Sequence, residues 1–222
     1  IGSLPISLQD DLIKEGRRFV SDHTSRAPTV FRAGNYGAGD ATLELLAANG
    51  FLADSSYNLW AQVTAGYSKQ IVTSEPTNIP FQHCGVVEYP VTSFLVPAAG
   101  AEGYRFFAPE GAAFCEMQAG LQRLAAVGVQ DVVVVLHSFS FIKPTDPNYR
   151  SARFNWIAHE RFRRLLQLLA SRPDEFEVVS LGDHVARQDA PPLGMASARH
   201  FISVPAWTVG LRLAGQVAQR LI

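Results

Sequence analysis

Four consecutive valines and a leucine, residues 132–136, constrain the fold of this chain more than any other feature. A short run that is apolar at every position is typical of a strand buried on both faces, and such strands belong to parallel sheets covered by helices. The run stops on His137, which is followed at once by Ser138 and Ser140. The sequence therefore predicts an α/β fold and raises the question of why its most buried strand ends on an imidazole.

Helical periodicity and short apolar runs alternate along the rest of the chain, which predicts a parallel sheet, either open and doubly wound or closed as a barrel. Without a linker or repeat, residues 1–222 are expected to form a single domain. Residues 58–112 are interpreted as an irregular insertion, because Pro and Gly interrupt their extended pieces. The expected helices are 8–20, 40–50, 114–127, 150–171 and the amphipathic C-terminal helix 205–222, and the other expected strands are 29–31, 51–56 and 176–181.

Composition excludes several functional classes. The net charge is −1 and 47% of the 222 residues are hydrophobic, so no basic field indicates a nucleic-acid partner. No run approaches the roughly 20 apolar residues of a membrane span, so no membrane partner is expected. The two cysteines match no zinc-finger spacing and do not define the compartment, for which the cytoplasm is slightly favoured. A homo-oligomer remains compatible with the sequence.

Three of the expected strands pass from apolar to ionisable residues at their carboxyl ends. "TVF" is followed by Arg32, "FLA" by Asp54 and "VVVVL" by His137. The active sites of parallel α/β folds form at this edge, and converging titratable groups suit general acid–base chemistry. Simpler interpretations stay open: Arg32 and Asp54 could form a structural ion pair, His137 could be a surface residue, and Ser138 could cap a loop.

The glycine cluster "RAGNYGAGD", residues 32–40, does not have the G-x-G-x-x-G spacing of a dinucleotide site. We expect these glycines to turn the backbone sharply beside Arg32 and to bring Tyr36 over the rim. The six histidines form no HxH, HxxxH or HExxH motif, so no complete metal site is visible in this chain. Asp183, beside His184, is interpreted as a helix cap rather than as half of a ligand pair.

Taken in order, "FRAGNYG", "DSSYN", "EYPVTSF" and "LHSFSF" resemble the polysaccharide deacetylase family of carbohydrate esterases. The resemblance implies a distorted (β/α) barrel and metal-dependent hydrolysis of N- or O-acetyl groups from a carbohydrate substrate. It implies that Arg32 orients a base carboxylate, that Asp54 tunes a catalytic histidine, and that His137 is that histidine and the general acid. Asn35, Tyr36 and Ser138 would contact the glycan.

The resemblance also implies a divalent metal, usually zinc, whose ligands and base should precede the Arg32 strand. The residues ahead of Arg32 do not supply them; they offer only Asp10, Asp11, Asp22 and His23. We therefore expect a barrel that is incomplete on its N-terminal side, either through truncation or because the protein is a degenerate member of the family. Truncation is favoured, because a barrel without its first strands would expose an apolar sheet edge. The alternative function is a non-catalytic glycan-binding or scaffold barrel that has lost its metal site.

Overall fold

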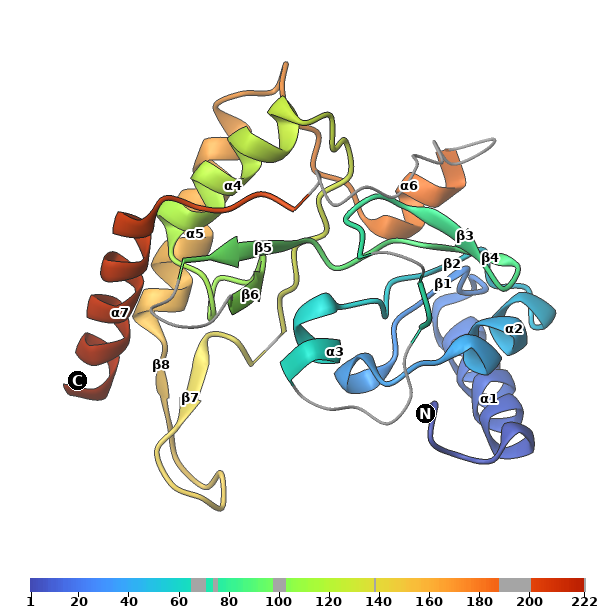
Figure 1. Ribbon diagram of the computed structural model, residues 1–222. Coiled ribbons are helices and arrows are strands. Elements are labelled where there is room, and N and C mark those ends of the chain that lie inside the picture. The colour runs from blue at the N-terminus through green and yellow to red at the C-terminus, as the bar shows by residue number, and fades with distance from the viewer. Residues whose placement is uncertain (65–70, 74–75, 98–102, 138, 188–200, 222) are drawn as a thin grey trace. The chain divides into compact units, whose positions relative to one another are not determined.

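The computed structural model describes residues 1–64, 71–73, 76–97, 103–137, 139–187 and 201–221 (Figure 1). Its contacts divide the chain into two compact units, and each is described by itself. The first unit comprises Ile1–Val91, Val129–Asp131 and Val179–His200, and the second comprises Thr92–Gly128, Val132–Val178 and Phe201–Ile222. The single domain and the barrel both stay predictions.

The first unit is built on one mixed sheet with the strand order β1-β2-β4-β3. β1, β2 and β4 are parallel, and β3 joins β4 as an antiparallel hairpin. The strands are β1 (Val30–Phe31), β2 (Ala53–Asp54), β3 (Phe81–His83) and β4 (Val86–Glu88). The helices are α1 (Ile6–Thr24), the 3-10 turn η1 (Gly34–Tyr36), α2 (Asp40–Ala48), α3 (Leu59–Thr64) and α6 (Leu181–Arg187).

α1 and α2 pack together through a small apolar core and a buried polar contact. Leu43 and Leu46 of α2 are fully buried, as is most of Ile13 of α1. Between the helices, Thr42 Oγ1 donates a 2.7 Å hydrogen bond to Gln9 Oε1. Because both of these polar groups are buried and paired, they add specificity to the contact without the cost of an unsatisfied donor.

In the second unit the structure describes three helices and two antiparallel strand pairs. The helices are α4 (Phe114–Ala126), α5 (Trp156–Ala170) and α7 (Ala206–Leu221). The strand pairs are β5 (Ser93–Val96) with β6 (Gly103–Phe106), and β7 (Ile142–Pro144) with β8 (Ala152–Phe154). Glu116 of α4 is fully buried, and it accepts a 3.1 Å hydrogen bond from Nε of Arg212 on α7. A buried ion pair therefore links these two helices.

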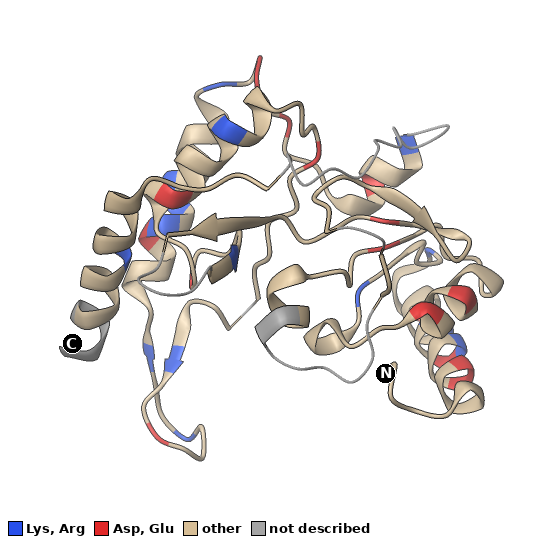
Figure 2. Ribbon diagram, viewed as in Figure 1, with Lys and Arg blue, Asp and Glu red and all other residues tan. Residues whose placement is uncertain are grey.

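Charged residues of both signs lie along α1 and α5 (Figure 2). They form ion pairs one helical turn apart, such as Lys14 with Asp10 on α1 and Arg163 with Glu160 on α5. These are solvated helix faces, as the near-balanced charge predicts. Among the helices that the structure describes, none is both long enough and apolar enough to cross a membrane.

The expected helices form, although the one expected at 150–171 begins only at Trp156, after strand β8. The apolar runs are less regular than the sequence predicts. Residues 129–137 adopt no strand: Val135 donates to the Phe107 carbonyl and Val133 pairs with Thr92, but these bonds do not continue as a ladder. Val135 alone of the four valines is buried, and Leu136 is exposed. Residues 176–180 also form no strand. The expected insertion, by contrast, contributes β4 to the middle of the main sheet.

Candidate functional site

Three ionisable residues lie at the carboxyl ends of neighbouring parallel strands in the first unit. Arg32 directly follows β1, Asp54 ends β2 and Glu88 ends β4. The register pairs Phe31 with Asp54, and Asp54 with Glu88. Because parallel strands that are in register end at the same edge, a cation and two carboxyls lie in a row at the edge where α/β proteins place their sites.

Asp54 and Glu88 form a carboxyl pair that is completely buried. The two carboxyls lie close enough to interact, and Glu88 Oε2 has no hydrogen-bond partner among the described residues. The Asp54 oxygens also accept bonds from Ser56, 2.9 Å from its hydroxyl and 2.8 Å from its backbone N–H. Glu88 Oε1 accepts a 2.8 Å bond from the Tyr57 N–H. Two ionised carboxylates have no donor between them, so Glu88 Oε2 can bond to Asp54 only when the pair shares a proton.

Burial sets the protonation of this pair. It raises the pKa of Glu88 well above its ordinary range, and the negative charge of Asp54 raises it further. Burial also raises the pKa of Asp54, while the hydrogen bonds from Glu88 and Ser56 act in the opposite direction. A low-dielectric site disfavours the first charge and disfavours a second one more strongly. The pair therefore keeps a proton at pH values where an exposed glutamate has lost its own.

Arg32 is bonded to Ser55 rather than to Asp54. Its Nε donates to the Ser55 carbonyl at 2.9 Å, and one terminal nitrogen donates to the Ser55 hydroxyl at 2.7 Å. The hydroxyl in turn donates to the Tyr89 carbonyl at 2.7 Å. The Arg32 side chain is exposed to solvent, yet its positive charge interacts with both carboxyls of the pair. In place of the Arg32–Asp54 ion pair that the sequence left open, Ser55 binds the guanidinium beside the carboxyl pair.

The loop after β1 forms the sharp turn that the glycine cluster predicts, although the residues with left-handed φ in this turn are not glycines. Asn35 and Tyr36 both have left-handed φ, 51° and 57°. Asn35 is exposed and Tyr36 is half-buried, near enough to Arg32 for their charges to interact. Their predicted contact with a glycan remains a prediction. Ser138, the third predicted contact residue, lies outside the described residues.

His137 belongs to the second unit, where it is exposed. Its ring stacks on Phe139 with the centroids 4.7 Å apart, and its backbone N–H donates to the Ser140 hydroxyl at 3.0 Å. Ser140 therefore caps the turn after the valine run. Because Arg32 and Asp54 belong to the first unit, the convergence of all three residues stays a prediction.

The sequence interpretation missed Glu88, although the signal was present. "VVE" passes from apolar to ionisable at a strand end just as "TVF" and "FLA" do, but it lies within the residues interpreted as an irregular insertion. The sequence predicts Asp183 as a helix cap, but Ser180 is the cap of α6: its hydroxyl accepts from the Asp183 N–H at 3.1 Å and donates to the Asp183 carboxylate at 2.8 Å. The neighbouring His184 has a different partner: its Nε2 lies 3.0 Å from Asp131 Oδ1.

The carboxyl pair does not fit the zinc ion that the family resemblance implies. Catalytic zinc takes three protein ligands, commonly histidines, and keeps one position open for water. Both Asp54 oxygens accept hydrogen bonds from Ser56, and neither carboxyl has any exposed surface.

Comparison with protein-family models, with curated proteins and with solved structures finds no match for this chain. The resemblance to polysaccharide deacetylases therefore depends on the four quoted motifs alone.

Proposed function

We propose that this chain acts in the hydrolysis of acetyl groups from a glycan, with Arg32, Asp54 and His137 as its functional groups. The observation that supports this most is the row formed by Arg32, Asp54 and Glu88 at the carboxyl edge of the parallel sheet. Two of these residues come from the motifs that resemble the polysaccharide deacetylases. Glu88 opens a third such motif, "EYPVTSF".

In this proposal the carboxyl pair supplies one fixed negative charge. Since the pair shares a proton, Asp54 can remain a carboxylate while Glu88 acts as its hydrogen-bond donor. Ser56 holds Asp54 from two directions, which gives the charge a fixed position. The role of His137 as the acid that protonates the leaving amine or alcohol is inferred from the resemblance.

Acetate release from an acetylated chito-oligosaccharide by the full chain, with and without added zinc, tests the proposal. His137→Gln is expected to lower the rate by about 100-fold to 10,000-fold, the usual cost of losing a general acid. His23→Gln is the matched control, because His23 is an exposed histidine on α1 bonded to its own helix. Full activity in His137→Gln would refute the assignment of the acid, and no acetate release by the full chain would refute the proposed hydrolysis.

A second candidate function, glycan binding without catalysis, is favoured by the poor fit of the carboxyl pair to zinc. A pair that is fully buried and bonded within its own sheet can also serve to stabilise that sheet. Calorimetric titration with the same oligosaccharide distinguishes the two functions. Binding without acetate release, and without any requirement for metal, would support the non-catalytic protein and exclude the hydrolase.

A further inference from the structure

A second group of chemically active side chains lies between α2 and the β3–β4 hairpin. Asp40, His83 and Cys84 each offer one ligand atom, and these atoms all lie within 4.8 Å of one another. His83 Nε2 is 2.8 Å from Asp40 Oδ1. All three residues are half-buried, so the group is reachable from solvent yet partly shielded from it. None of the three belongs to the carboxyl pair or to the motifs that resemble the deacetylases.

The helix start leaves Asp40 available for this group. Asp40 is the first residue of α2, but the capping contact comes from Thr42, whose hydroxyl accepts a 3.2 Å bond from the Gly39 N–H. The Asp40 carboxylate accepts instead from His83 and from the Val72 N–H at 3.1 Å. An aspartate at a helix start usually bonds the local backbone. Here its oxygen is directed to an imidazole on another element.

The hairpin turn holds Cys84 in an uncommon backbone conformation. β3 and β4 are joined by two residues, and both have positive φ: 48° at Cys84 and 87° at Gly85. Such turns favour Asn, Asp or Gly at the first position, because other side chains are strained there. The sequence thus has a thiol where a common turn residue would be less strained.

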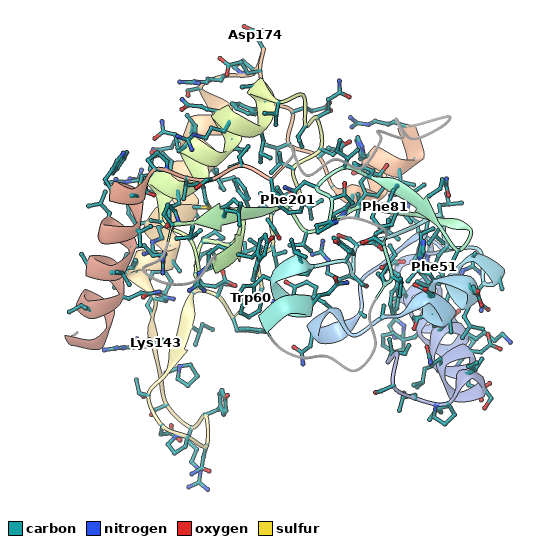
Figure 3. The ribbon with its side chains drawn as sticks, viewed as in Figure 1. Phe51, Trp60, Phe81, Lys143, Asp174 and Phe201 are labelled. Atoms are coloured by element: carbon teal, nitrogen blue, oxygen red, sulfur yellow. The ribbon has the colours of Figure 1, made fainter. Side chains whose placement is uncertain are left out.

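Close packing fixes the hairpin against the helix. A Cβ on Gly85 would lie only 2.9 Å from the Cβ of Ala47, so the turn approaches α2 as closely as its backbone allows. Phe81, labelled in Figure 3, lies on the same hairpin, with its ring 5.9 Å from that of His83. The ligand atoms therefore come from two elements whose separation is set by the fold, before any ion binds.

The donor set selects the kind of ion. A thiolate, an imidazole and a carboxylate are the ligands of zinc and of its spectroscopic substitute cobalt, whereas magnesium and calcium prefer oxygen alone. Three protein ligands plus a water complete a tetrahedral shell.

We propose that Asp40, His83 and Cys84 form a binding site for a zinc-type divalent cation that ties the β3–β4 hairpin to α2. In this site the ion replaces the hydrogen bond between His83 and Asp40, and Cys84 loses its proton to become a thiolate ligand. The site is independent of the proposed deacetylase function, because it shares no residue with the groups assigned there.

Metal titration of the full chain, first stripped with a chelator, tests the site. Zinc is expected to bind with one high-affinity ion per chain and to raise the melting temperature. Cobalt is expected to give a sulfur-to-metal charge-transfer band together with the visible bands of a tetrahedral ion. Cys84→Ser should remove the charge-transfer band. His83→Gln should weaken zinc binding by more than about 100-fold, above the usual cost of losing an outer hydrogen-bond partner.

Two further variants keep the test decisive. Cys115→Ser is the matched control, because Cys115 is a half-buried cysteine on α4 in the other unit, and it should leave both bands unchanged. Cys84→Asn supplies a residue that the turn favours, so it should fold at least as well as the wild type while losing the charge-transfer band. A band that survives in Cys84→Asn, or unchanged zinc affinity in His83→Gln, would overturn the site and leave the Asp40–His83 contact as a simple hydrogen bond.

Discussion

Replacing Glu88 with glutamine tests the shared proton in the buried carboxyl pair. The amide has the shape of the protonated acid: its oxygen can accept from Tyr57 as Glu88 Oε1 does, and its NH₂ can donate to Asp54. Unlike Glu88, the amide never ionises. The substitution therefore preserves the hydrogen bonds and removes the cost of keeping a proton on a buried carboxyl.

The sign of the effect follows from proton linkage. The folded-state pKa of Glu88 is raised well above the ordinary value of 4.5, so below pH 4.5 the carboxyl is protonated in both the folded and the unfolded chain. As the pH rises above that value, only the unfolded chain releases the proton, and the wild type loses stability until the folded-state pKa is passed. The loss is about 1.4 kcal/mol for each pH unit within this window. Glu88→Gln avoids this loss.

Urea unfolding of both proteins at a series of pH values from 4 upward measures the difference in the free energy of unfolding. We expect almost no difference in the free energy of unfolding at pH 4. Above pH 4 the free energy of unfolding of Glu88→Gln should exceed that of the wild type by a growing amount. This difference corresponds to about 3–6 °C in melting temperature per pH unit for a chain of this size. An advantage that is the same at every pH, or a variant that is less stable than the wild type at neutral pH, would refute the shared proton.

The same substitution at Glu116 is the matched control with the opposite sign. Glu116 is as completely buried as Glu88, but it pairs with Arg212 and lies near Arg161 rather than beside a carboxyl. Glu116→Gln leaves a buried cation without its anion and should cost about 3–5 kcal/mol at neutral pH. Two fully buried glutamates thus respond oppositely to one chemical change, because their neighbours carry opposite charges.

Three glycine substitutions, followed by thermal or urea unfolding, test the close packing around the backbone. Gly85→Ala should destabilise the protein by about 2–4 kcal/mol, because it combines left-handed strain with a clash against Ala47, whereas Gly128→Ala, with φ 82° and open space around it, should cost only about 1–2 kcal/mol. Equal costs would contradict the tight contact between the hairpin and α2. Gly120→Ala should cost about 1–3 kcal/mol, because its Cβ would lie 2.6 Å from the buried Phe107 ring, and a neutral outcome would show that the ring can move aside.

Local sequence signals were sufficient for the five longest helices and for two strand ends. Periodic apolar residues predict α1, α2, α4, α5 and α7 because a helix buries one face through contacts within a few residues. The rule that strands end on ionisable residues found Arg32 and Asp54 and, applied to "VVE", would have found Glu88 as well. These features depend on neighbours along the chain, which the sequence shows directly.

Only the tertiary structure decided which residues meet. Asp54 and Glu88 are separated by 34 positions, and strand pairing between β2 and β4 brings their carboxyls together in a buried site, which is what perturbs their pKa values. The valine run shows the converse, since its composition is typical of a buried strand, yet its backbone finds only scattered partners and Val135 alone is buried. Asp40, His83 and Cys84 likewise match no metal motif, because their proximity comes from a hairpin packed on a helix rather than from spacing along the chain. Burial and charge interaction act through space, and the distances through which they act are set by the fold.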